Sequence, residues 1–299
     1  MPSVPRRRRA RAWLFASLLS AVACVHAQPE IHALTGIIEG HQVGGVAVDL
    51  VGDLYVADFG DIVWKITPEG RREVLASGLY GSSGNAIDRE GNLLQSNFYG
   101  NSIVKIDRNG RTSALANGLS GPVGIALEKK TGDAYVANCA GNSVAKITPD
   151  GAVSPFAKSD LFKCPNGVAF DADGNLYVAN FRSNRLLKVD PKGAVAPFAT
   201  VAREGLGHLC FSRDRFYVTA YHTHELYEVT LKGDVKRLLG NGERGIVDGG
   251  PDTARLSFPN GIACDPFVPR LYINEYVAES TSSLPRRAIV REVVLDAGK

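Results

Sequence analysis

Three histidines, His208, His222 and His224, lie close together in the sequence and are the first candidates for chemistry. Imidazole titrates near neutral pH, so a histidine can accept a proton from a reacting group or bind a metal ion. We expect His208 to act as a general base and His222 to contact the substrate. The alternatives are that His208 packs against a neighbouring strand and that His222 and His224 are hydrated loop residues.

Two asparagines and one glutamate form a second set of candidates. Asn166 and Asn260 each stand in a Pro-Asn-Gly tripeptide, and Glu275 ends a strand-like run soon after the second one. Amide and carboxylate oxygens are the ligands that hard divalent cations prefer, and such a cation can polarise a carbonyl group or activate water. We predict that these three residues bind a divalent metal, with Ca²⁺ expected and Zn²⁺ or Mn²⁺ as alternatives. The competing interpretation is that the asparagines shape loops and Glu275 forms a salt bridge.

These candidates sit in a segment that is repeated six times along the chain. Each copy has a glycine near its start, and these glycines are Gly45, Gly84, Gly124, Gly167, Gly207 and Gly261. A period of about 40–45 residues with four short apolar runs is typical of a β-propeller blade. We therefore predict an all-β fold, a six-bladed β-propeller of four-stranded antiparallel blades.

The last repeat lacks its fourth strand, because the chain ends soon after the apolar run at residues 288–296. Residues 29–36 resemble the fourth strands of the other repeats. We predict that this N-terminal strand completes the last blade and closes the ring, which removes open sheet edges.

The longer and more varied connections share one end of the predicted propeller, and we expect function at that end. They join the second strand to the third within a blade, and one blade to the next. The longest of them, residues 240–258, could partly cover the central opening.

Five repeats carry an aromatic residue just after the second strand. These residues are Phe59, Phe98, Phe181, Tyr221 and Tyr276. Such rings could line a pocket for a carbohydrate or an aromatic ligand, but their recurrence favours packing between blades.

The last repeat, with its run PNGIACDP followed by LYINE, resembles an NHL repeat. From about residue 40 to the C-terminus the chain is similar to the broad group of SMP-30/gluconolactonase-like and streptogramin-lyase-like propellers. The resemblance implies a metal held by Asn, Glu and Asp residues, and Asn166 matches that pattern. Gly44 and Leu206 stand where the group has its Glu and Asp, so Glu275 would have to supply the carboxylate from another strand.

Residues 1–27 combine a run of arginines, an apolar stretch too short to span a bilayer, and a plausible cleavage site after Ala27. This pattern predicts a signal peptide that is removed, a single domain over residues 28–299, and a periplasmic or secreted location. The alternative is a lipid anchor on Cys24. Without this segment 29 basic side chains face 31 acidic ones, a balance that gives no basic footprint for nucleic acid.

Four cysteines remain in the predicted mature chain. Cys139 and Cys164 fall in connections that the topology places side by side, so we expect them to form a disulfide. Cys210 and Cys264 occupy equivalent strand positions where other repeats carry apolar residues, so we expect them to be buried and unpaired.

The sequence is consistent with two kinds of function. The first is an exported, metal-assisted, lactonase-like hydrolase that acts on a small cyclic ester or a related carbonyl compound at the mouth of the channel. The alternative is a non-catalytic propeller of the cell envelope that binds a small ligand or a protein, or a streptogramin-lyase-like enzyme. In each case we expect a monomer without a membrane span.

Overall fold

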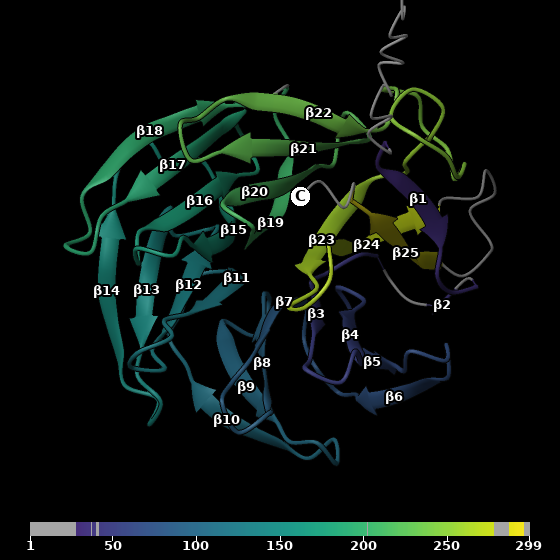
Figure 1. Ribbon diagram of the computed structural model, residues 1–299. Helices are drawn as coiled ribbons and strands as arrows, with labels where there is room; N and C mark the ends of the chain where they lie inside the picture. The colour runs from purple at the N-terminus through teal and green to yellow at the C-terminus, as the bar shows by residue number, and fades with distance from the viewer. Residues whose placement is uncertain (1–27, 37, 40–41, 202, 278–286, 296–299) are drawn as a thin grey trace, which may run out of the picture.

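The computed structural model describes residues 28–36, 38–39, 42–201, 203–277 and 287–295. Within these residues the chain forms six antiparallel sheets arranged in a ring (Figure 1), which confirms the predicted six-bladed propeller. This described part of the chain contains no helix that is long and apolar enough to cross a membrane.

The first three blades follow the order of the sequence. Blade 1 holds β3 (Val46–Val48), β4 (Leu54–Ala57), β5 (Val63–Ile66) and β6 (Arg72–Ala76). Blade 2 holds β7 (Ser82–Ile87), β8 (Leu93–Asn97), β9 (Ser102–Ile106) and β10 (Thr112–Ala116). Blade 3 holds β11 (Pro122–Leu127), β12 (Ala134–Asn138), β13 (Ser143–Ile147) and β14 (Val153–Lys158).

The next two blades repeat this arrangement, and the last blade departs from it. Blade 4 holds β15 (Pro165–Phe170), β16 (Leu176–Asn180), β17 (Arg185–Val189) and β18 (Val195–Thr200). Blade 5 holds β19 (Leu206–Ser212), β20 (Arg215–Ala220), β21 (Glu225–Thr230) and β22 (Val235–Leu239). Blade 6 holds β23 (Pro259–Cys264), β24 (Arg270–Val277), β25 (Arg287–Val294), β1 (Glu30–Ala33) and the short β2 (Ile38–Glu39).

Blade 6 is built from both ends of the chain, as predicted. β1 pairs antiparallel with β25, from Glu30 opposite Val294 to Ala33 opposite Arg291 (Figure 1). The side chain of Ile31 in β1 is fully buried, in an apolar cluster that also contains residues of blades 5 and 6. The N-terminal strand therefore contributes to the core as well as to the sheet.

The two ends of the ring differ in their connections. We call the end with the short turns between the first and second strands the lower end, and the end with the longer connections the upper end. An aspartate stabilises the short turns: Asp88 Oδ1, for example, accepts hydrogen bonds from the backbone N–H groups of Glu90 (3.1 Å) and Asn92 (2.8 Å). Such side-chain bonds replace the strand pairing that a turn must give up.

The innermost strands approach one another so closely that only glycine fits at their contacts. A Cβ atom added to Gly84 would lie 2.8 Å from the Cα atom of Gly124, and one added to Gly124 would lie 3.1 Å from the Cα of Gly167. The repeated glycines therefore mark where successive blades touch around the axis.

Blade 5 departs from this pattern by one residue. Pro165 pairs with Asn180 in blade 4, and Leu206 pairs with Ala220 in blade 5. His208 therefore occupies the position of Gly167, and a Cβ on Gly167 would meet the His208 Cα at 2.6 Å. The sequence analysis took Gly207 as the repeated glycine of blade 5, with His208 following it. The alignment of this repeat is therefore wrong by one position.

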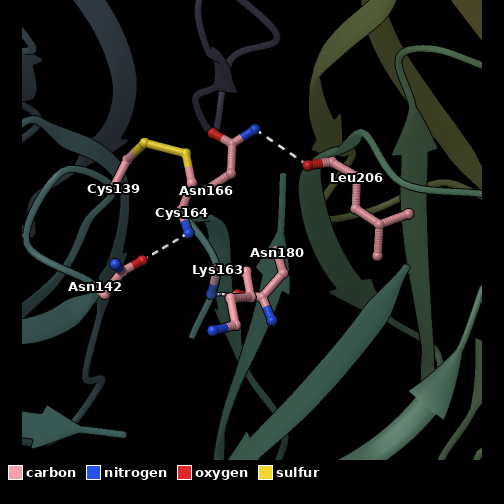
Figure 2. The surroundings of a disulfide bond; sticks show 7 residues. All are labelled: Cys139, Asn142, Lys163, Cys164, Asn166, Asn180 and Leu206. Atoms are coloured by element: carbon pink, nitrogen blue, oxygen red, sulfur yellow. Dashed lines mark hydrogen bonds between the residues drawn. A yellow bond between two sulfur atoms is a disulfide. The ribbon is translucent and has the colours of Figure 1, made fainter. Parts of the chain in front are cut away.

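The shift explains a second disulfide that the sequence analysis missed. Cys210 pairs across its blade with Tyr217, and Cys264 pairs with Leu271. Because of the shift, the two cysteines lie on opposite faces of adjacent inner strands and meet in a disulfide, with their Cα atoms 5.7 Å apart. Our expectation that they are unpaired is wrong. The predicted disulfide between Cys139 and Cys164 is confirmed (Figure 2).

The long connection at residues 240–258 lies along the outer edge of blade 6 rather than over the central opening. Ile31 and Gly249 exchange two backbone hydrogen bonds of 3.0 and 3.2 Å, which attach the connection to β1. This segment therefore covers an otherwise open sheet edge.

Candidate ligand-binding site

A cavity of about 270 Å³ opens at the upper end, where all six blades meet. We call it the mouth cavity. Its wall is formed by Gln42, Val43, Phe59, Ser83, Phe98, Val123, Cys139, Cys164, Asn166, Phe181, Arg182, Tyr221 and Asn260. The wall thus combines aromatic rings, amides, one disulfide and one guanidinium group. Its volume lies at the small end of the range for ligand pockets.

Four of the five recurring aromatic residues line this cavity. Phe59 and Phe98 lie on one side with their ring centroids 5.6 Å apart, and Phe181 and Tyr221 lie on another side with centroids 5.7 Å apart. The rings therefore pack between neighbouring blades, as expected, and they also present apolar surface to a ligand. Tyr276 instead packs against Phe258, at 6.2 Å.

The two predicted asparagines both reach the cavity, and both are held in one orientation. Asn166 donates a hydrogen bond from Nδ2 to the Leu206 carbonyl (3.2 Å), and Asn260 donates from Nδ2 to the Val43 carbonyl (2.7 Å). Figure 2 shows the Asn166 oxygen turned away from Leu206. Because the nitrogens are already engaged by a neighbouring blade, the amide oxygens are the atoms that remain to meet a ligand.

Other polar residues at the ends of the second strands are used by the fold. Asn180 Oδ1 accepts from the Lys163 N–H (3.0 Å; Figure 2). Asn180 Nδ2 donates to the Leu161 carbonyl (3.0 Å). These bonds shape the connection that carries Cys164. Asn180 therefore has a structural role.

Glu275 lies apart from the mouth cavity, in a buried ion pair. Both Glu275 and Arg291 are fully buried, and the Arg291 Nη1 atom lies 3.3 and 3.2 Å from the two carboxylate oxygens. Arg291 also donates to the carbonyl of Val247 (2.7 Å) and to Asp248 (2.8 Å), so the pair holds the long connection of residues 240–258. Burial raises the pKa of Glu275, and the charge and hydrogen bond of Arg291 oppose that rise.

The three histidines occupy three different environments. His208 is buried, its Nε2 atom has no hydrogen-bond partner, and desolvation lowers its pKa to about 4. His224 accepts a hydrogen bond at Nδ1 from the Phe258 N–H (3.2 Å), so it stabilises a loop. His222 is exposed, and its ring lies 5.3 Å from those of Phe181 and Tyr221, beside the cavity wall.

The predicted metal and base residues are therefore not brought together. Asn166 and Asn260 line the mouth cavity, while Glu275 and His208 are absent from the wall that surrounds it. Among the described residues no group of three or more His, Cys, Asp or Glu could hold a metal ion. The described cavity wall carries Arg182 and no carboxylate. This donor set suits an anion better than a hard dication, which prefers several charged oxygens.

Two cavity residues were missed by the sequence analysis. Arg182 directly follows Phe181, one of the recurring aromatic residues. This position in the repeat could have identified Arg182 as a cavity residue. Ser83 occupies the position that Asn166 takes in blade 4, and its buried Oγ has no hydrogen-bond partner in the described structure. Ser83 thus offers a further polar atom to a ligand.

The sheets and this cavity define a six-bladed β-propeller with an axial cavity at its upper end. Residues 81–222, which form blades 2 to 4 and the first part of blade 5, match the model of the SMP-30/gluconolactonase/LRE-like region. This match confirms the resemblance of the chain to that group of propellers. No curated protein matches the chain.

Solved structures share this architecture at low sequence identity. Virginiamycin B lyase from Staphylococcus aureus is 14% identical, with a TM-score of 0.61 over 90% of this chain and 100% of that chain. A gluconolactonase from Xanthomonas campestris is 18% identical, with a TM-score of 0.66 over 88% and 94%. An auxiliary nutrient binding protein from Bacteroides thetaiotaomicron is 14% identical, with a TM-score of 0.73 over 89% and 76%. These similarities show the fold alone.

Proposed function

We propose that this chain is an exported propeller that binds a small organic anion with a flat apolar face in its mouth cavity. The observation that carries the proposal is the composition of the cavity wall. Four aromatic rings, the guanidinium of Arg182 and the oriented amides of Asn166 and Asn260 converge on one space of about 270 Å³.

Each part of the wall has a definite task in this proposal. The rings of Phe59, Phe98, Phe181 and Tyr221 stack against an aromatic ring or the apolar face of a sugar. Arg182 pairs with a carboxylate or phosphate, for which its planar fork of donors is well suited. Because their nitrogens are already hydrogen-bonded, Asn166 and Asn260 accept hydrogen bonds from ligand hydroxyl groups. Few-atom ligands suit a cavity of this size.

Export is supported by the cysteines. The described chain has two disulfides, Cys139–Cys164 and Cys210–Cys264. Structural disulfides persist in oxidising compartments and are rare in the cytosol. This supports the expectation that residues 1–27, which lie outside the described residues, direct the protein to the periplasm or the medium.

The relatives favour both binding and catalysis. The proteins of similar fold include an auxiliary nutrient binding protein, a gluconolactonase and a streptogramin B lyase. All three must bind a ligand, and the aromatic and polar side chains of the mouth cavity are sufficient for binding one.

A metal-assisted, lactonase-like hydrolase is the second candidate, favoured by the match over residues 81–222, which includes Asn166. Asn166 and Asn260 would contribute oxygen ligands, and a bound dication would supply a Lewis acid. His222, beside the cavity wall, is better placed to contact a substrate than the buried His208. A rise in Tm on adding Ca²⁺, Mn²⁺ or Zn²⁺, lost in Asn166→Ala, would support this candidate.

Binding is tested with a panel of aromatic carboxylates, sugar acids and their uncharged analogues, followed by the rise in Tm and by calorimetry. Arg182→Ala should weaken the binding of a charged ligand by about tenfold or more, since a charge-assisted hydrogen bond contributes about 1.5–3 kcal/mol. It should leave the uncharged analogue unaffected. Phe181→Ala should weaken the binding of both.

Arg185→Ala is the matched control, because Arg185 is an exposed arginine at the end of the same connection but is not part of the cavity wall. It should bind every ligand as the wild type does. The proposal fails if no compound of the panel raises the Tm, or if binding is equally strong in wild type and Arg182→Ala.

A further inference from the structure

Four large apolar side chains are exposed together at the lower end, opposite the mouth cavity. Leu50 and Val51 are each 74% exposed in the turn between β3 and β4, while Phe267 (66%) and Val268 (43%) lie in the turn between β23 and β24. Both turns border a single groove of about 290 Å³, whose wall also includes Pro68. We call these four side chains the lower apolar patch.

Exposed apolar residues are ordinary when they are scattered, but a contiguous group of them marks an interaction site. Here two neighbouring turns both carry such residues, and they belong to blades 1 and 6, on either side of the ring closure. The packing of the propeller does not require them, because these side chains point out of the fold.

Three backbone N–H groups of these turns are hydrogen-bonded within the fold. Asp49 Oδ1 accepts from the backbone N–H of Val51 (3.0 Å), and Asp265 Oδ1 accepts from those of Phe267 (2.9 Å) and Val268 (3.1 Å). A backbone group that enters an apolar medium needs such a partner. These three N–H groups can therefore leave water without losing a hydrogen bond.

The N-terminal part of the chain enters the fold beside this patch. Glu30 at the start of β1 lies opposite Val294, and Val294 lies opposite Arg270, which follows the turn with Phe267. The 27 residues that precede the described chain include the apolar stretch of residues 12–23 and Cys24. Cys24 lies six positions before Glu30, and an extended chain of that length spans at most about 20 Å.

We propose that the lower end of the propeller docks on a lipid bilayer through the lower apolar patch. Here we take the alternative to cleavage after Ala27, in which the mature chain begins at Cys24 and carries a lipid there. This lipid holds the bilayer within reach of the two turns, and the four side chains of the lower apolar patch enter it. Two weak attachments together give stable membrane binding where one gives only transient binding. The mouth cavity then faces away from the membrane, open to its ligand.

The test uses the full-length chain, produced in bacteria with its own N-terminal segment, and flotation of the cell membranes on a density gradient. The purified protein is floated in parallel with vesicles of phosphatidylethanolamine and phosphatidylglycerol. Leu50→Ser combined with Phe267→Ser should reduce membrane binding by about tenfold or more, because two large side chains no longer leave water. Val51→Lys should act in the same direction.

Tyr80→Ser combined with Tyr99→Ser is the matched control, because these side chains are 65% and 55% exposed at the upper end. It should float as the wild type does, and equal Tm values show that all variants fold. The proposal is overturned if the wild type remains at the bottom of the gradient, or if the patch variant floats equally well. It is also overturned if the wild type is a dimer that the patch substitutions dissociate, because the patch would then join two copies.

Discussion

At the scale of single residues, His208 shows how one exception in a repeat creates a special environment. The other blades carry glycine at this position, where the inner strands touch, and blade 5 places an imidazole there. Gly207 precedes it, at the position that Asn166 takes in blade 4. The imidazole is buried without a hydrogen-bond partner at Nε2, and this burial favours its neutral form.

We predict that His208 makes the stability of the protein depend on pH. Burial lowers its pKa to about 4, so between about pH 6.5 and 4 the unfolded chain takes up a proton that the folded chain does not. The free energy of unfolding should fall as the pH falls through this window, by about 3 kcal/mol. Denaturant unfolding at several pH values checks this, and His208→Gly should remove that part of the dependence. An equal pH dependence in both proteins would contradict it.

Glu275 was predicted as a metal ligand, and its position in the repeat was assigned correctly: it pairs with Pro259 as Asn180 pairs with Pro165. Its partner could not be predicted, because Arg291 lies on the next strand and the repeat pattern gives no sign of a buried arginine. Asn166 and Asn260, in contrast, directly precede the repeated glycines Gly167 and Gly261, and that position in the repeat was enough to expect them at the mouth.

We predict that Glu275 stabilises the fold and does not act on the ligand. Glu275→Ala should lower the free energy of unfolding by about 3–5 kcal/mol, because it leaves the buried Arg291 without its carboxylate partner. Glu275→Gln keeps a hydrogen-bond acceptor and should cost less. Denaturant unfolding measures both, and calorimetry should find ligand binding unchanged in Glu275→Gln. If Glu275→Gln lost ligand binding while its free energy of unfolding stayed unchanged, Glu275 would have to be part of the ligand site.

At the scale of elements, the sequence was sufficient for the blades and insufficient for the register of one strand. Turn residues and apolar alternation locate four strands in each repeat, and the strand at residues 29–36 was recognised by its likeness to the others. Aligning blade 5 on Gly207 displaced β19 by one residue, and this error hid the pairing of Cys210 with Cys264. A shift of one residue turns every side chain to the other face of a strand.

We predict that the two disulfides contribute unequally to stability. The loop-entropy model gives about 4 kcal/mol for Cys210–Cys264, whose cysteines are 54 residues apart, and about 3.5 kcal/mol for Cys139–Cys164, which are 25 apart. Double Cys→Ser variants, compared by denaturant unfolding, should show this order. Only the Cys139 and Cys164 variant should also alter ligand binding, since only that pair lines the mouth cavity. The reverse order, or altered binding in the other variant, would contradict the assignment.

At the scale of the whole molecule, the ring depends on a strand of four residues, β1, to complete blade 6. The mouth cavity takes its wall from all six blades, so its shape exists only when the ring is closed. The connection of residues 240–258 strengthens the closure, because it pairs with β1 on the side away from β25.

We predict that Ile31→Ala destabilises the whole propeller, because Ile31 anchors β1 in the core. The loss in the free energy of unfolding should be about 2–5 kcal/mol, as for other buried isoleucines. Val74→Ala, in the outermost strand of blade 1 where the side chain is 47% exposed, is the control and should change stability by less than about 0.5 kcal/mol. Chemical denaturation measures both, and equal losses would show that β1 is dispensable.

The shared blade also has a consequence for the order of events during synthesis. Among the described strands, β1 is the first to leave the ribosome or a translocation channel, and its partner β25 is the last. Blades 1 to 5 can form while the chain is still growing. The nascent protein keeps an open sheet edge at blade 6 until β25 has been synthesised. A chain that is released before β25 has been made should therefore aggregate and be sensitive to proteases, even though most of its blades are complete.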